Sequence, residues 1–132
     1  MSTIEVVSAV KSQRPRKLNP IEYTEFELGS IHWQGDVGIL RISKVPEGAR
    51  KINNEAQLAP GTSRGSRHLI HEACVFTMYR DGSEVTDGPV VDASTKLQVV
   101  HPDHGTVVMP PGIYKIVYQR QLSGDRIERV LD

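Results

Sequence analysis

The pattern of hydrophobic and polar positions divides the chain near residue 29. Residues 4–10 are mostly apolar but rich in β-branched side chains, which disfavour a helix. Residues 11–20 are polar, basic and twice interrupted by proline. From residue 29 onward, short apolar runs alternate with turn-forming residues, as is typical of β-strands. We therefore expect an N-terminal strand or arm with a basic, proline-containing connector over residues 1–28, followed by a β-domain over residues 29–132.

The β-domain is expected to contain six or seven strands. They cover residues 37–43, 67–72, 74–79, 96–100, 106–109, 113–122 and 127–131. The run at 113–122 has apolar residues on both faces, which predicts a central strand, and the Ser-Gly-Asp triplet after it predicts a hairpin turn. The acidic residues of an intervening stretch rich in Gly and Pro are expected in a solvated turn: Glu84, Asp87 and Asp92.

These strands define the expected fold class. A single open sheet would leave one apolar face in water, so the strands must close or pack against each other. The sequence therefore predicts a mainly β, small single-domain antiparallel β-barrel or sandwich with an extended N-terminal arm.

Composition and charge argue against several classes of function. The net charge is zero, although residues 1–20 carry +3 and the remainder −3, and aromatic residues make up only 5% of the chain, so specific nucleic-acid binding is not expected. The basic arm is most simply solvated surface, with a phosphate-binding arm as the alternative. Cys74, the only cysteine, lies in an apolar run and is expected to be a buried, inert thiol. No membrane span and no signal peptide are recognised, which predicts a cytoplasmic location.

Histidines carry the most distinctive chemical signal. His101 and His104 flank Pro102 and Asp103 in a predicted turn, where the proline breaks the strand and lets both imidazoles converge. Together with His68 they could form a three-histidine site for a divalent metal with an open position for water. A structural or surface role for these histidines is the competing interpretation.

The segment before His68 has the composition of an anion-binding loop. Residues 61–67 contain two glycines, three hydroxyl side chains and two arginines, which are the groups that bind phosphate or carboxylate. The order matches no known phosphate loop, so a plain turn is the alternative. His68 and His71 are three residues apart and point to opposite faces of a regular strand, so only one of them could join an interior site. The candidate ligand-binding residues are Arg64, Ser66, Arg67, His68, His101 and His104.

Four segments resemble a family of small uncharacterised bacterial and phage β-domain proteins. They read QGDV at 34–37, GSRHLI at 65–70, HPDHG at 101–105 and MPPGIYKIVYQRQ at 109–121. The family pattern is QGDV, GHxH, HxxHG and PxGxYxVxxQR, which aligns His68, His101 and His104 with its histidines. This chain has Ser66 where the family has the first histidine of GHxH, which would remove one metal ligand. The turn and the scattered histidines also resemble cupin barrels in architecture, but the cupin His-x-His with a following Glu is missing.

Three functions from different classes follow. The favoured hypothesis is a β-domain that binds a small anionic ligand, such as a nucleotide, at a mouth lined by histidine and arginine; a phage-encoded protein that sequesters host nucleotides in the host cytoplasm would fit it. The first alternative is a metal-dependent, cupin-like enzyme that uses His68, His101 and His104. The second is a structural protein whose homo-oligomer buries the apolar outer face of residues 113–122. The sequence supports no decision on whether the protein is an enzyme.

Overall fold

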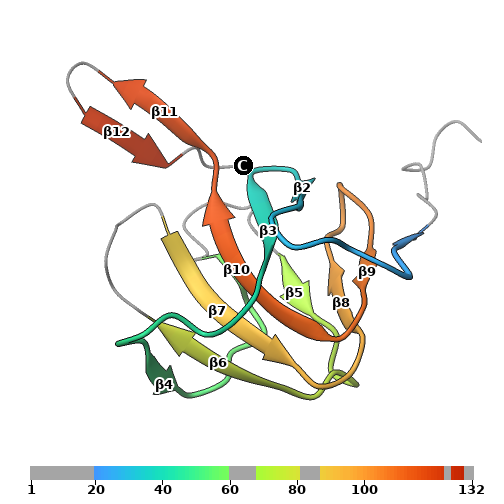
Figure 1. Cartoon of the computed structure of the whole chain (residues 1–132). Helices are drawn as coiled ribbons and strands as arrows, with labels where there is room; N and C mark the ends of the chain where they lie inside the picture. Colours follow the sequence, from blue (N-terminus) through green and yellow to red (C-terminus); the bar gives the residue numbers. More distant parts are fainter. Residues whose placement is uncertain (1–19, 60–67, 81–86, 124–125, 130–132) are drawn as a thin grey trace, which may run out of the picture.

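The computed structural model describes residues 20–59, 68–80, 87–123 and 126–129, and this part of the chain contains strands and turns but no helix. It forms two main sheets and a separate two-stranded hairpin (Figure 1). The sheets pack face to face without closing into a barrel, so of the two expected architectures the sandwich is confirmed. Within these ranges there is also no helix long and apolar enough to span a bilayer.

The smaller sheet has four strands. Its order is β1 (Ile21–Glu22), β9 (Val107–Met109), β8 (Leu97–Val100) and β5 (Leu69–Ile70). β1 runs parallel to β9, whereas the β9–β8 and β8–β5 pairs are antiparallel. The beginning of the described chain is therefore built into the sandwich, while residues 1–19 of the arm and basic connector predicted over residues 1–28 lie outside the described residues.

The larger sheet has six antiparallel strands. Its order is β2 (Ile31–Gln34), β3 (Val37–Ile42), β10 (Gly112–Tyr118), β7 (Asp87–Ala93), β6 (Phe76–Arg80) and β4 (Arg50–Ile52). β10 lies between β3 and β7, as the predicted central strand requires. The strand expected over residues 113–122 ends at Tyr118, and β11 (Arg120–Ser123) then pairs with β12 (Arg126–Arg129) in the predicted hairpin, which extends away from the sandwich in Figure 1.

The hydrophobic core lies between the two main sheets. Tyr114, Ile116 and Tyr118 alternate along β10 and are buried, while the residues between them are partly exposed. Leu97 and Val99 of β8 pack into the same cluster from the opposite sheet. The Tyr118 hydroxyl donates a 2.8 Å hydrogen bond to the Leu58 carbonyl, so this buried polar atom is satisfied.

β7 is not among the predicted strands, because it contains a glycine and a proline, which are typical of turns. The solvated turn expected around Asp92 is wrong: residues 87–93 form a strand, and Asp92 pairs with Ile113 and is partly buried. The register against β10 shifts between Lys115 and Val117, which leaves an extra residue on β7 beside Pro89. Proline is tolerated in a sheet at such a bulge because it need not donate a ladder hydrogen bond.

Cys74 also differs from expectation. It is partly buried, and its sulfur accepts a hydrogen bond from the backbone N–H of Gln98 at 3.3 Å. The thiol expected to be buried within the apolar run is therefore only partly buried, and its inertness stays a prediction. The side chain packs at the edge of the core because it lies in the loop before β6 rather than within a strand.

Replacing Gly88 with alanine is expected to lower the free energy of unfolding by about 1–3 kcal/mol. A Cβ at this position would lie 2.7 Å from the Tyr118 hydroxyl oxygen and 2.9 Å from the ring. The ring cannot move away without giving up its hydrogen bond to Leu58. Urea denaturation measures the loss, and exposed Ser94→Ala on the turn after β7 is the control that should change stability little. Equal stability of the two variants would contradict the packing described here.

We expect His32 to make the free energy of unfolding decrease as the pH falls. Its Nδ1 lies 2.9 Å from the Tyr23 hydroxyl, and burial lowers the pKa of its imidazole below the usual 6.5. Below pH 6.5 the unfolded chain binds a proton at this position more readily than the folded chain, so this contribution is complete above pH 6.5 and is lost as the pH falls. Denaturation at pH 7 and pH 5 should show a larger acid loss for wild type than for His32→Gln.

Candidate functional site

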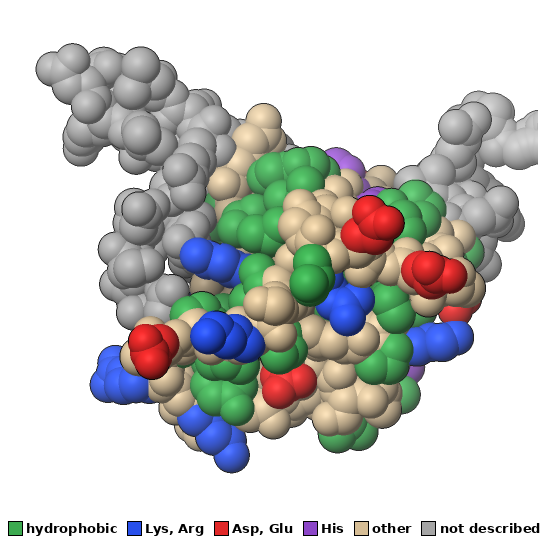
Figure 2. All heavy atoms as spheres, viewed as in Figure 1, with side chains coloured by type: hydrophobic (Ala, Val, Ile, Leu, Met, Phe, Trp, Pro, Cys, Tyr) green, Lys and Arg blue, Asp and Glu red, His purple; other side chains and the backbone are tan. Residues whose placement is uncertain are grey.

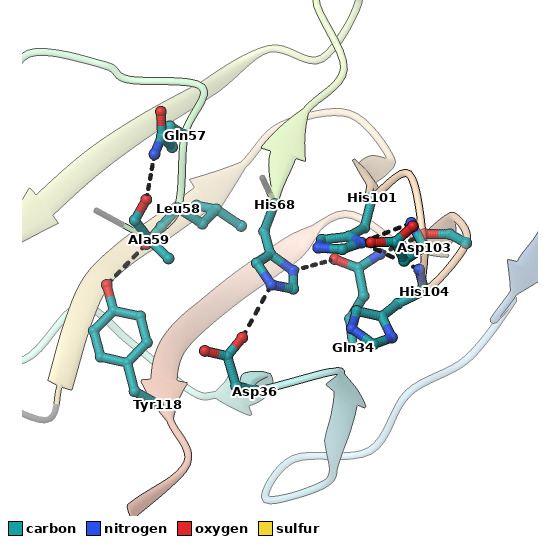
Figure 3. Close-up of polar contacts among 11 residues, drawn as sticks. Gln34, Asp36, Gln57, Leu58, Ala59, His68, His101, Asp103, His104 and Tyr118 are labelled. Carbon is teal, nitrogen blue, oxygen red and sulfur yellow. Dashed lines mark hydrogen bonds and ion pairs between the residues drawn. The ribbon is translucent and has the colours of Figure 1, made fainter. Parts of the chain in front are cut away.

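The three candidate histidines meet at one end of the sandwich. His68, His101 and His104 form a cluster of rings, although His68 is separated by 33 residues from His101 in the chain (Figure 3). The other ligand-binding candidates, Arg64, Ser66 and Arg67, lie outside the described residues. The structure thus brings together every described member of the predicted site.

Strand pairing explains why His68 lies beside His101. β5 and β8 are antiparallel with Leu69 opposite Val100, so His68, which precedes β5, comes beside His101, which follows β8. His101 and Gly105 exchange two backbone hydrogen bonds of 3.2 Å and close the turn that carries His104. Gly105 has a φ of 80°, a left-handed conformation that glycine adopts without strain. The turn is therefore fixed by the backbone, independently of any ligand.

The cluster runs from the core to the surface. The His101 ring centroid lies 4.3 Å from that of His68 and 4.4 Å from that of His104, so His101 contacts both other rings. His68 is completely buried and His101 is 5% exposed, whereas His104 is exposed. His71 is exposed as well, so of the pair His68 and His71 only His68 reaches the interior, as the strand period requires. His104 is therefore the solvent-exposed end of the cluster.

Gln34 fixes the orientation of His68. The side-chain nitrogen of Gln34 donates to the carbonyls of Val99 (3.0 Å) and Gly105 (2.8 Å) across the two sheets. Carbonyl oxygens only accept, so the amide nitrogen must face them and the amide oxygen must face His68. This oxygen lies 2.8 Å from Nδ1 of His68. The Nδ1 atom of His68 therefore carries a proton and donates it to Gln34.

Asp36 completes a buried pair with His68. Its carboxylate oxygen lies 3.1 Å from Nε2 of His68, and both side chains are excluded from solvent. Because Nδ1 is the donor to Gln34, a neutral ring would have a lone pair on Nε2, so a hydrogen bond between Nε2 and the carboxylate requires one proton between these two atoms. Whether the pair is imidazolium with carboxylate or imidazole with carboxylic acid, its net charge is zero. Asp36 therefore adds no net negative charge to the cluster.

His101 is held in one tautomer by its own turn. Its Nδ1 accepts the backbone N–H groups of Asp103 (3.0 Å) and His104 (3.1 Å), as the dashed lines in Figure 3 show. A nitrogen that accepts two N–H groups holds no proton, so the proton of the neutral ring is on Nε2. His101 thus presents Nε2 as a hydrogen-bond donor. A metal bound at Nε2 would need the proton on Nδ1, where it would clash with the two amides.

This arrangement favours hydrogen bonding over metal coordination. Both nitrogens of His68 are engaged by Gln34 and Asp36, and the rings pack side by side. Among the residues that the structure describes, no three or more His, Cys, Asp or Glu side chains are grouped as metal ligands. Metal binding by His68, His101 and His104 stays a prediction.

Sequence reasoning missed two members of the site, Gln34 and Asp36. Both belong to the QGDV segment, where Gly35 has a φ of 61° and forms the two-residue turn between β2 and β3. The signal was present, because a glutamine just before a tight turn and an aspartate within it are held on a rigid hairpin. Their burial could not be foreseen, because it depends on segments 32 to 71 residues away.

The fold and the site define a small β-sandwich protein with a buried Gln–His–Asp network that opens to the surface through two further histidines. A family model described as a domain of unknown function (DUF8820) matches residues 33–119. The chain belongs to this family, and the matched segment contains all five side chains of the network and the histidine cluster. Neither the curated proteins nor the solved structures include a significant match.

Proposed function

We propose that the histidine cluster binds a small anionic ligand, such as a nucleotide or another phosphate compound. The observation that carries the proposal is the meeting of His68 with His101 and exposed His104, because His68 directly follows Arg64, Ser66 and Arg67 in the sequence. Arg67 is the immediate chain neighbour of buried His68, so one arginine is covalently adjacent to the cluster. Guanidinium, hydroxyl and imidazole donors together are suited to phosphate or carboxylate oxygens.

The charges of the network support an anion rather than a cation. A lone buried aspartate would repel an anion, but Asp36 shares a proton with His68 and the pair is neutral. In the fixed tautomer of His101, Nε2 carries a hydrogen and not a lone pair, so this nitrogen is a hydrogen-bond donor. A hydrogen-bond acceptor is therefore the chemical class that matches this ring.

Gln34 and Asp36 have a positioning role in this proposal. They hold the His68 ring by both nitrogens, and His68 packs against the His101 ring that would contact the ligand. His101 is in turn fixed by the backbone of its own turn. A site whose polar groups are already oriented loses little entropy on binding, which favours affinity for a small ligand.

The test is an NMR titration of the full chain with inorganic phosphate and, separately, with nucleoside monophosphates and triphosphates. We expect saturable shifts of the His101 and His104 signals, and loss of these shifts in Arg67→Ala. His104→Ala should weaken binding about tenfold, the loss of one hydrogen bond to a charged group. Nitrogen-15 spectra of the imidazoles should also show His101 as the Nε2–H tautomer.

Matched controls separate site-specific binding from general charge effects. Arg80→Ala removes an exposed cation from β6, and His71→Ala removes an exposed histidine close to His68 in the chain but outside the cluster. Both should retain binding. Equal loss of affinity in Arg67→Ala and Arg80→Ala would overturn the proposal, as would an absence of saturable shifts with all of these anions.

A further inference from the structure

The two main sheets have four edge strands, and three of them are protected against pairing. β5 is covered by the segment at 56–58, through the hydrogen bonds from Leu58 N–H to the His68 carbonyl and from Ile70 N–H to the Ala56 carbonyl. β4 carries two exposed cations, Arg50 and Lys51. β1 has only two residues and contains Glu22, which forms an ion pair with Lys96. Short, charged or covered edges are the usual means by which β-proteins avoid edge-to-edge association.

β2 lacks these protections. Its sequence, Ile-His-Trp-Gln, has no formal charge at neutral pH and no proline. Ile31 is 37% exposed and Trp33 is 46% exposed, although both are large hydrophobic side chains. They pack over Gly38 together with Val117, within 2.9 Å of where a Cβ of Gly38 would lie. We call Ile31, Trp33, Gly38 and Val117 the edge patch; Figure 2 shows hydrophobic side chains gathered over β2 and β3 on this face.

The backbone of β2 presents hydrogen-bonding groups away from the sheet. Arg41 donates its backbone N–H to the Ser30 carbonyl, and the tight turn pairs Gln34 with Val37. Residues 30, 32 and 34 therefore face β3, and the N–H and carbonyl groups of Ile31 and Trp33 point outward. Neither residue makes a backbone hydrogen bond to another described segment. These groups are spaced to pair with an extended strand.

We propose that β2 pairs with β2 of a second copy of this chain, so that two sandwiches associate through a two-fold axis at His32. Antiparallel pairing about this axis places Ile31 of one copy opposite Trp33 of the other, and each outward N–H faces an outward carbonyl. The exposed aliphatic and indole side chains of the edge patch then cover each other on the outer face. The two six-stranded sheets become one continuous sheet.

Charge argues for a second copy rather than an unrelated strand. A two-fold axis brings each side chain near its own symmetry mate, so a charged edge such as β4 would place cations close together and repel. β2 is the edge on which self-pairing carries no such cost. An edge built to recognise a different, charged peptide would be expected to carry a complementary charge, and β2 carries none.

The test is sedimentation velocity of the full chain over a range of concentrations, together with fluorescence of Trp33, the single tryptophan of the sequence. We expect a monomer–dimer equilibrium, with Trp33 emission moving to shorter wavelength and its quenching by acrylamide falling as dimer forms. Ile31→Lys should weaken dimerisation about tenfold or more, because a charge then replaces the apolar contact with Trp33 of the second copy.

Leu69→Lys is the matched control. Leu69 has the same exposed fraction as Ile31, 37%, and also lies on an edge strand, but that edge is covered by residues 56–58. The Leu69→Lys variant should dimerise as strongly as wild type. A wild-type monomer at all concentrations overturns the proposal, and so does a dimer that persists in Ile31→Lys or that forms without a change in Trp33 emission. The wild-type measurements decide the question even where a variant fails to fold.

Discussion

Replacing Asp36 with alanine is expected to lower the free energy of unfolding by about 3–5 kcal/mol, the usual cost of removing one partner of a buried, paired charge. The variant leaves Nε2 of His68 buried without the carboxylate that now lies 3.1 Å away. His68 cannot turn toward solvent, because it is fully buried and its Nδ1 is held by Gln34. Urea denaturation at neutral pH measures the loss.

Two further substitutions define what the Asp36 result means. Asp103→Ala removes an exposed aspartate from the turn beside the cluster and should change stability by less than about 0.5 kcal/mol. In the double variant Asp36→Ala, His68→Phe the buried Nε2 is removed as well, but the Gln34 amide oxygen loses its donor, so we expect no more than a partial recovery of the loss. A single variant as stable as wild type would contradict the buried pair.

Replacing Gln34 with alanine should lower the free energy of unfolding by about 3 kcal/mol, because the buried Val99 carbonyl, the Gly105 carbonyl and one imidazole nitrogen each lose a hydrogen bond, although Gly105 keeps the one from His101. The amide joins the β2–β3 hairpin to Val99 and Gly105 of the opposite sheet. The variant should also release the His68 ring, which imidazole NMR would show as a changed Nδ1 signal.

Gln34→Glu and Gln119→Ala complete the Gln34 experiment. Glutamate is similar in shape but offers no N–H to the two carbonyls, so Gln34→Glu should be at least as destabilising as the alanine variant. Gln119 is an exposed glutamine after β10, and its alanine variant should match wild type. If Gln34→Glu retains full stability, the orientation assigned to the amide is wrong.

Local alternation was enough to predict the strands that build the core. β3 and β10 are rich in Ile, Val and Tyr, and their bounds in the structure lie within one or two residues of the prediction at most ends. β7 was missed because Gly88 and Pro89 are normally turn residues, and the bulge that accommodates them depends on the register with β10. β2 and β4 are short edge strands with three or four residues, too few to show a period.

The site residues also fall into those that local sequence predicts and those that depend on distant segments. His101 and His104 are close in the chain, so their convergence could be predicted from the turn between them, and His68 came from the resemblance and the strand period. Gln34 and Asp36 are polar and would ordinarily be assigned to the surface. Their burial is made favourable only by His68, Val99 and Gly105, and pairing between distant segments cannot be recognised from local pattern.

The contacts of Gln34 also affect how the protein folds. Its two hydrogen bonds close loops of 65 and 71 residues, and the Asp36–His68 pair closes a loop of 32 residues. Such contacts give the chain a high contact order, for which folding times of milliseconds to seconds are typical. The network therefore forms only after both sheets have docked, and no isolated hairpin or fragment of this chain can assemble it. Hydrogen exchange at Gly105 and Val99 should accordingly report global unfolding rather than local opening.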